Sequence, residues 1–356
     1  MADKWSPGHV DKFPLKVEKN PQNDQLYLRK QELLEECKRL VGTSLSGKRP
    51  LNIAILGPPG CGKSAFLNTI FAIFSNECWR EHAKYGDFQK FGKQVTRRLK
   101  YYKKETYYSQ ADTYLMPTFL DMTGFENDDS ELNKELLNII LSGQMEENEV
   151  LSDVVNYGQR YGMRNLHKKY ALRPVHKRVH RIIVVCSSNP KSNLPNVLLE
   201  AIADISSSKD ITVYGVLTHA DKFPTELDDS VEDREERFMQ TLGIPKTRFA
   251  RIVNYCPDVD PTFAFEDTIC PSLDVPVLRL MRQILSREAN DDKEPDNRFH
   301  PDNFVDSCIY FLRQNWFPLV WSIVILLISY VTGDIRLSVI LGIILIYLWG
   351  NDLLTI

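Results

Sequence analysis

The residues best suited to chemistry form a glycine-rich octapeptide, GPPGCGKS, at positions 57–64. It fits the pattern G-x-x-x-x-G-K-[ST], in which backbone N–H groups and the positive end of the following helix bind nucleotide phosphates. In such a loop the lysine reaches the β- and γ-phosphates, and the hydroxyl holds Mg²⁺. We therefore predict Lys63 as a catalytic residue and Ser64 as a metal ligand. The predicted contacts in this loop are Gly57, Pro58, Pro59, Gly60, Cys61, Gly62, Lys63, Ser64 and Ala65.

A second candidate motif follows the apolar segment 114–120. Asp121-Met122-Thr123-Gly124 is a D-x-x-G sequence. In P-loop enzymes an aspartate at this place steadies Mg²⁺, and the glycine N–H contacts the γ-phosphate. The pattern is common by chance, so its position after a phosphate loop is what gives it weight. We predict Asp121 as a metal ligand and Gly124 as a catalytic residue.

A third motif indicates which base is bound. Thr218-His219-Ala220-Asp221 resembles the guanine-binding sequence [NT]-K-x-D, with histidine in place of lysine. The Asp221 carboxylate can accept hydrogen bonds from guanine N1–H and from its exocyclic amine, a donor pair that adenine lacks. Two alternatives stay open, namely a preference for ATP and a purely structural role for Asp221 as a helix N-cap. We also predict that Thr218, His219 and the later Asn254 contact the nucleotide.

GTPase-type domains close a switch threonine onto Mg²⁺ between the first helix and the next strand. Thr96 precedes the charged segment 99–108 and is predicted to fill this role, as metal ligand and catalytic residue. Three other threonines compete with it: Thr106, Thr113 and Thr118. Phe125 stands where a glutamine would orient the attacking water. Slow hydrolysis is therefore predicted, unless dimerisation or a partner supplies the missing group.

These motifs need strands to position them, and the chain alternates short apolar runs with longer helical patterns. Unbroken apolar runs are typical of strands buried on both faces, so the sequence predicts an α/β fold of the P-loop GTPase type, with a mostly parallel sheet and helices on both faces. Strands are predicted at 51–56, 99–108 (an edge strand), 114–120, 181–187, 211–218 and 251–255. Helices are predicted at 25–41, 65–74, 130–141, 196–206, 233–242 and 275–287.

The domain organisation follows from shifts in composition. We predict a polar arm and helix at 1–48, a nucleotide-binding domain at 49–290 and a polar linker at 291–313. The seven cysteines show no CxxC spacing, which argues against a zinc site or disulfides and suits a reducing compartment. No secretory signal is expected. The helix N-terminus beside Cys61 is expected to lower the pKa of its thiol.

Residues 314–356 form an apolar C-terminal segment that is predicted to be a membrane anchor. The 17 residues at 316–332 carry no charge, which gives about 26 Å as a helix and approaches the length that spans a bilayer. A second apolar run covers 337–349. A re-entrant hairpin or a single span fits this pattern, and a buried helical pair is the alternative. We predict membrane attachment through residues 316–349, with the catalytic domain facing the cytoplasm.

A net charge of −3 gives no global attraction to nucleic acid, and none is expected as a partner. The segment 160–181 is nevertheless strongly basic. It is interpreted as a solvated insert between strands, with anionic lipid or RNA as the alternative partners.

Taken together, the motifs resemble the interferon-induced protein 44 family of GTPase-like proteins. The resemblance covers roughly residues 50–290, and the apolar tail departs from it. It implies a cytoplasmic GTP-binding domain of the P-loop class, connected with innate immune responses. The segments that carry it are 53–68, 115–124, 141–143, 178–187, 218–221 and 253–255.

The sequence thus predicts a membrane-anchored, slow GTPase that uses GTP/GDP and Mg²⁺. Its GTP state is expected to act as a switch that alters self-association, as a homodimer, or binding to a protein partner. The alternative is a nucleotide-binding scaffold with negligible turnover.

Overall fold

The protein is analysed as a computed structural model, which divides into two compact units at residues 1–295 and 296–356. The structure describes residues 25–46, 49–84, 98–110, 112–122, 125, 127–171, 177–223, 229–256, 264–266 and 268–286, all in the first unit. The predicted arm at 1–24, the linker and the membrane segment at 314–356 lie outside these ranges. No helix within the described ranges has both the length and the hydropathy that a membrane crossing requires.

Six strands form one sheet in the order β2-β3-β1-β4-β5-β6. All neighbouring strands run parallel except β2 and β3, which are antiparallel. The predicted α/β class with a mostly parallel sheet is confirmed. The strands are β1 (Asn52–Leu56), β2 (Lys100–Tyr102), β3 (Thr118–Asp121), β4 (Arg181–Ser187), β5 (Thr212–Thr218) and β6 (Phe249–Arg251).

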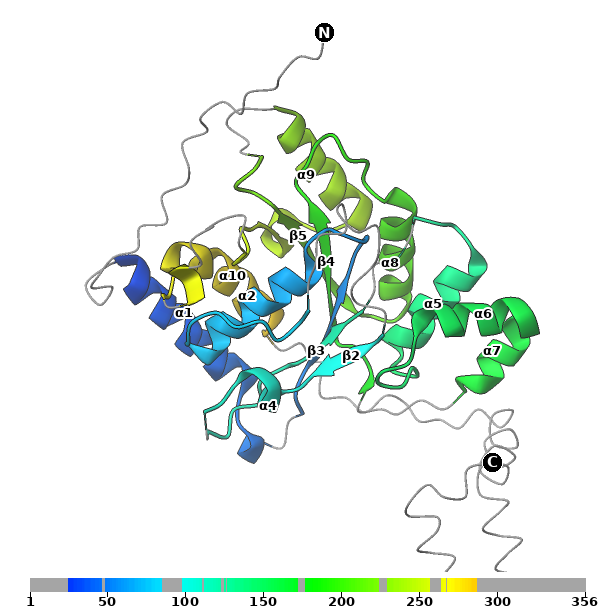
Figure 1. Ribbon diagram of the computed structural model, residues 1–356, viewed down its shortest axis with the longest axis horizontal. Helices are drawn as coiled ribbons and strands as arrows, with labels where there is room; N and C mark the ends of the chain where they lie inside the picture. Colours follow the sequence, from blue (N-terminus) through cyan, green and yellow to red (C-terminus); the bar gives the residue numbers. More distant parts are fainter. Residues whose placement is uncertain are drawn as a thin grey trace, which may run out of the picture. The chain divides into compact units, whose positions relative to one another are not determined.

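Helices cover both faces of this sheet, with α1, α2 and α10 on one face and α5, α8 and α9 on the other (Figure 1). The described helices are α1 (Gln25–Val41), α2 (Lys63–Ser75), α4 (Lys104–Tyr107), α5 (Glu131–Leu141), α6 (Leu151–Tyr161), α7 (Met163–Lys169), α8 (Asn196–Ser208), α9 (Asp229–Leu242) and α10 (Pro271–Ile284).

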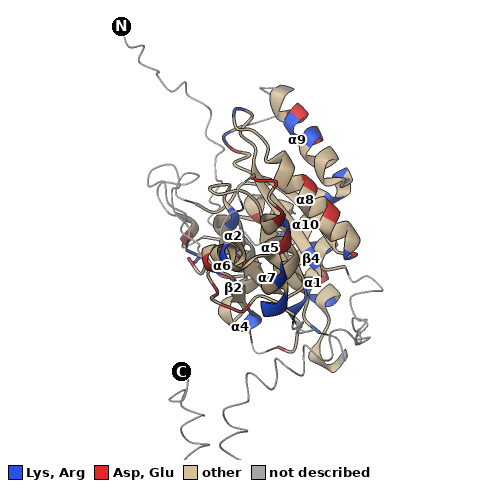
Figure 2. Cartoon of the chain, turned by 90° about the vertical axis from the view of Figure 1, so that its right-hand side faces the viewer, with Lys and Arg blue, Asp and Glu red and all other residues tan. Residues whose placement is uncertain are grey.

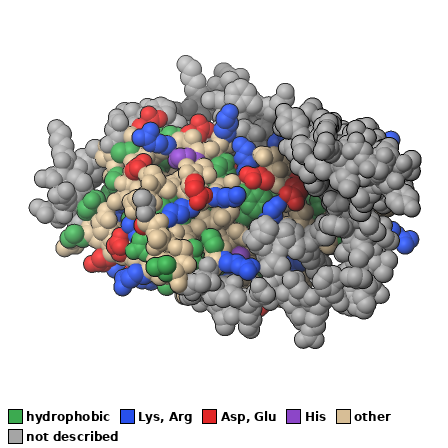
Figure 3. Space-filling view, turned by 90° about the horizontal axis from the view of Figure 1, so that it is seen from below, with side chains coloured by type: hydrophobic (Ala, Val, Ile, Leu, Met, Phe, Trp, Pro, Cys, Tyr) green, Lys and Arg blue, Asp and Glu red, His purple; other side chains and the backbone are tan. Residues whose placement is uncertain are grey.

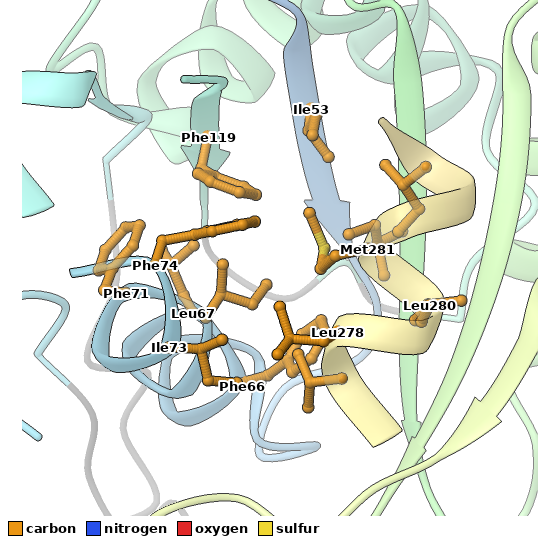
Figure 4. Packing of buried hydrophobic residues seen from close by; sticks show 14 of the residues in the cluster. Ile53, Phe66, Leu67, Phe71, Ile73, Phe74, Phe119, Leu278, Leu280 and Met281 are labelled. Atoms are coloured by element: carbon orange, nitrogen blue, oxygen red, sulfur yellow. The ribbon is translucent and has the colours of Figure 1, made fainter. Parts of the chain in front are cut away.

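The central strands are apolar throughout because both of their faces are buried. In β1, Ile53 and Ile55 belong to the core under α2 and α10, whereas Ala54 and Leu56 belong to the core under α5 and α8. Figure 4 shows Ile53 facing the packed side chains of α2 and α10. Each buried aliphatic or aromatic side chain contributes about 1.5–3 kcal/mol, so these two layers hold the strand ends in fixed positions.

The predicted strand at 99–108 is wrong in its second half. It does form the edge of the sheet, but β2 ends at Tyr102 and the short helix α4 follows. There Tyr107 is buried and stacks on Phe71 of α2, with ring centroids 4.5 Å apart and an interplanar angle of 13°. This long-range aromatic contact outweighs the local preference for strand.

The strand predicted at 251–255 is displaced toward the N-terminus. β6 ends at Arg251, and the chain then leaves the sheet toward α2 and α10. The Tyr255 backbone N–H donates to Thr69 Oγ1 of α2, and the Tyr255 hydroxyl donates to Asp274 of α10 at 2.8 Å. Asp274 also forms a buried ion pair with Lys30 of α1, at 2.9 Å. Helix α1 is therefore packed into the same unit as the sheet.

Candidate functional site

The predicted site residues gather at the carboxyl ends of the parallel strands. Strand β1 has β3 on one side and β4 on the other, so the chain reverses its direction of winding there. In open α/β sheets, ligands bind outside the carboxyl ends of the strands at such a point. The residues 57–64, called the 57–64 loop below, leave β1 at this place and begin α2.

Two glycines give the 57–64 loop its path. Gly57 has φ +146°, and a Cβ at this position would lie 2.0 Å from the carbonyl oxygen of Val185 in β4. Gly62 has φ +86° and is the N-cap of α2, where a Cβ would lie 3.3 Å from Asn254 Nδ2. At Gly57 only glycine allows the backbone to approach β4 this closely, and at Gly62 the positive φ favours glycine where α2 begins.

The Lys63 ammonium lies over this loop. Its Nζ donates hydrogen bonds to the carbonyl oxygens of Pro58 at 2.8 Å and Gly57 at 3.2 Å, and the side chain is buried. Burial removes water from the ammonium, and two neutral carbonyls compensate this loss of hydration less well than an anion would. The arrangement therefore favours an anion at the loop.

Asp121 at the end of β3 faces the first turn of α2. Its Oδ2 accepts a hydrogen bond from Ser64 Oγ at 3.1 Å. Its Oδ1 is buried and has no hydrogen-bond partner among the described residues. Burial raises the pKa of the Asp121 carboxyl to about 6, although nearby Lys63 and the Ser64 hydrogen bond act to lower it.

This pair of oxygen groups fits Mg²⁺. A hydroxyl and a carboxylate are the hard ligands that this ion prefers, and it commonly takes one or two protein carboxylates, with phosphate and water filling the remaining positions. No cluster of three or more His, Cys, Asp or Glu side chains occurs in the described part of the chain. The buried Asp121 Oδ1 is therefore a candidate ligand atom for such an ion.

Thr218 and His219, at the end of β5, contact the neighbouring strand β4, and Thr218 also contacts the 57–64 loop. Thr218 Oγ1 lies 2.8 Å from the carbonyl oxygen of Cys61 and 3.2 Å from that of Cys186. His219 has φ +60°, and its Nδ1 lies 3.2 Å from Ser187 Oγ. Thr218 therefore joins the loop to the end of β4, and His219 contacts the end of β4.

Two further predicted residues follow the strand ends: Asp221 comes after β5 and Asn254 comes after β6. Asn254 is buried; its Nδ2 lies 3.5 Å from the carbonyl oxygen of Gly62, and its Oδ1 has no hydrogen-bond partner within the described ranges. Asp221 is half-exposed beyond the end of β5. The structure brings Asn254 to the loop, whereas no contact joins the Asp221 carboxylate to it.

Two predicted site residues, Thr96 and Gly124, lie outside the described residues. The expected pKa of Cys61 is wrong in direction. Its thiol is buried and donates to the Val185 carbonyl oxygen at 3.0 Å, and this burial raises the thiol pKa. The loop cysteine therefore acts as a packing residue that joins the loop to β4.

Arg234 of α9 is a positioning residue that the sequence analysis missed. Its buried guanidinium donates from Nε to the Ser187 carbonyl oxygen at 2.9 Å, and it also bonds Ser192. It thereby fixes the segment after β4, against which His219 lies. An arginine within an acidic helical segment such as α9 is expected to form exposed ion pairs. The sequence therefore gives no sign that Arg234 is buried and bonded to backbone carbonyls.

Phe125 is also placed by the structure. It is buried in the core under α5, and its backbone N–H donates to the Gly57 carbonyl oxygen at 3.3 Å. A side chain in this position cannot orient water.

The comparison with known proteins adds no relative, because neither a protein-family model nor a curated protein matches the chain.

The Gly57→Ala variant tests the close approach of the loop to β4. Added contact with Val185 and strain at positive φ are expected to lower the free energy of unfolding by about 3 kcal/mol or more. Gly243→Ala is the matched control, because Gly243 has φ +64° but open space around its Cβ. That change is expected to cost about 1 kcal/mol. Urea unfolding measures both, and equal losses would contradict the packing argument.

Proposed function

We propose that this chain binds GTP with Mg²⁺ at the 57–64 loop and hydrolyses it slowly, as a nucleotide-controlled switch. The observation that carries the proposal is the pairing of Ser64 with Asp121 beside a glycine loop that opens a helix. The buried, unpartnered Asp121 Oδ1 supports a metal at this point. The P-loop GTPase type of fold is part of the same proposal.

The chain's own groups would divide the work as follows. The backbone N–H groups at the start of α2 lack intrahelical partners and would donate to phosphate oxygens. Lys63 would exchange the carbonyls of Gly57 and Pro58 for the β- and γ-phosphates, gaining charged partners. Ser64 and Asp121 would hold Mg²⁺, which neutralises charge on the phosphates when bound. Thr96 and Gly124 are proposed to close on the γ-phosphate.

Guanine specificity rests on Asp221. The described residues contain no hydrogen-bond or ion-pair partner for its carboxylate, so both oxygens stay available to a base. Asn254, with its unpartnered Oδ1 near Gly62, is proposed to line the same side of the nucleotide. Thr218 and His219 are proposed to support the base from the end of β5.

A second candidate function is a nucleotide-binding scaffold with negligible turnover. The burial of Phe125 favours it, because an apolar, buried side chain at this position cannot hydrogen-bond an attacking water. Single-turnover hydrolysis of bound GTP, measured with and without liposomes, separates the two functions. Release of phosphate within minutes to hours supports the slow GTPase. Bound GTP that stays intact over days supports the scaffold.

Two wider parts of the proposal rest on the sequence. Membrane attachment through residues 316–349 follows from their apolar composition, with the nucleotide domain facing the cytoplasm. A role in innate immunity, through a homodimer or another protein partner, follows from the resemblance to the interferon-induced protein 44 family.

Removal of either proposed metal ligand tests the Mg²⁺ site. In Ser64→Ala and Asp121→Asn, the affinity for GTP in the presence of Mg²⁺ is expected to fall about tenfold or more, because charge-assisted ligands are lost. Ser75→Ala, at the other end of α2, is the matched control and should bind like the wild type. Titration of each variant with and without chelator measures the effect. Wild-type affinity that is the same with and without Mg²⁺ would contradict the site.

Changing Asp221 to Asn tests the choice of base. The variant is expected to lose GTP affinity about tenfold or more and to gain affinity for xanthosine triphosphate, whose 2-oxo group suits the asparagine amide. Asp204→Asn, on the exposed side of α8, serves as the control. Competition against a fluorescent nucleotide gives both affinities. Unchanged GTP binding in Asp221→Asn would argue for another base or another binding mode.

A further inference from the structure

Helices α6 and α7 form a helical hairpin at the edge of the domain (Figure 1). The chain turns between them at Gly162, which has φ +80° and open space around its Cβ position. The inner side of the hairpin is packed, since Gly158 lies against Leu132 of α5 and Leu166 is fully buried. The hairpin is thus a fixed element, and its outer side is presented to solvent.

The basic side chains of this region fall into two groups. The first group is paired with acids, namely His167 with Glu135, Lys169 with Glu149 and Lys177 with Glu146.

The second group is Arg160, Arg164 and Lys168, and these residues together with Tyr161 are defined here as the hairpin tip. Arg160, Tyr161 and Arg164 flank the turn, whereas Lys168 lies in the last turn of α7. The three cations of the tip are exposed, and no acidic side chain of the described chain lies within ion-pair distance of them. Arg164 and Lys168 are four residues apart and share one face of α7. In the cartoon of Figure 2, the Lys and Arg positions of α7 are coloured blue.

The face of the domain seen from below carries charges of both signs. In the view from below, basic and acidic side chains alternate over the described surface (Figure 3). Mixed charges of this kind cancel within a Debye length of about 8–10 Å. The three cations of the tip form no ion pair within the described ranges, so the tip is suited to an anionic partner.

An aromatic ring accompanies these cations. Tyr161 is 50% exposed, one of four large hydrophobic side chains that the described surface exposes. Its ring centroid lies 4.7 Å from that of Tyr157, and the Arg160 guanidinium lies 5.4 Å from the Tyr161 centroid. Tyrosine beside basic residues is typical of the interface between water and lipid, where the ring enters the headgroup layer and its hydroxyl stays wet.

We propose that the hairpin tip docks on an anionic phospholipid surface. A lipid surface fits better than RNA, because single-stranded RNA is held in a basic groove by several exposed aromatic rings, whereas the tip offers one exposed ring on a projecting turn. Each cation near an anionic bilayer strengthens binding about fivefold. The three cations together are expected to contribute about 100-fold.

Hydrogen exchange of the full chain tests the proposal, because it reads protection at residues 155–170 directly. The probes are phosphatidylcholine vesicles, vesicles with about 30% phosphatidylserine, and a single-stranded RNA oligonucleotide. Protection of the hairpin is expected only with the anionic vesicles. Exchange in the hairpin that is equal with the two kinds of vesicle would overturn the proposal.

The triple variant R160Q/R164Q/K168Q is expected to need about 100-fold more anionic lipid for half-maximal protection. The control R39Q/R237Q/K246Q removes the same charge from exposed positions on α1, α9 and the turn after α9. It should behave like the wild type, and an equal loss in the control would overturn the proposal in favour of general charge. Protection by RNA without protection by anionic vesicles would overturn it in favour of an RNA site. Exchange in α2 and α10 confirms that each variant is folded.

Discussion

The geometry of the site depends on one constraint, the close contact between the 57–64 loop and the ends of β4 and β5. Three contacts make it, and each leaves little room for change. Gly57 lies against the Val185 carbonyl, the Cys61 thiol donates to that same oxygen, and Thr218 Oγ1 lies 2.8 Å from the Cys61 carbonyl. Because the loop is fixed at these points, the first turn of α2 meets Asp121 at a set distance.

Buried polar groups extend this constraint to the outer helices. Thr69 of α2 accepts a hydrogen bond from the Tyr255 backbone, and the Tyr255 hydroxyl reaches the buried Lys30–Asp274 pair between α1 and α10. Loss of one partner of a buried ion pair typically costs 3–5 kcal/mol. On the other face, Arg234 ties α9 to the segment after β4. Helices on both faces therefore hold the strand ends that carry the candidate site.

The sequence predicted the parts of this structure that local pattern determines. Apolar runs marked β1, β4 and β5 to within a residue or two, and helical spacing gave α1 and α5 closely. The octapeptide and Asp121 were singled out by type and spacing, and the structure places Ser64 against Asp121. Features set by distant contacts were missed or displaced. Stacking of Tyr107 on Phe71 ends β2 early, and the role of Arg234 depends on carbonyls more than 40 residues away. The hairpin helices α6 and α7 were not predicted, although Leu151, Val154 and Val155 of α6 follow the i, i+3, i+4 spacing of a helix with one apolar face.

The most direct test of the proposed function is nucleotide titration of the purified full chain with fluorescent GTP and ATP analogues in the presence of Mg²⁺. Lys63→Ala is measured in parallel, because the ammonium is the one cation bound within the loop. The account predicts binding of GTP at least about tenfold tighter than of ATP, and a loss of at least about tenfold in the variant. Binding of neither nucleotide, or equal affinity in wild type and variant, would contradict it.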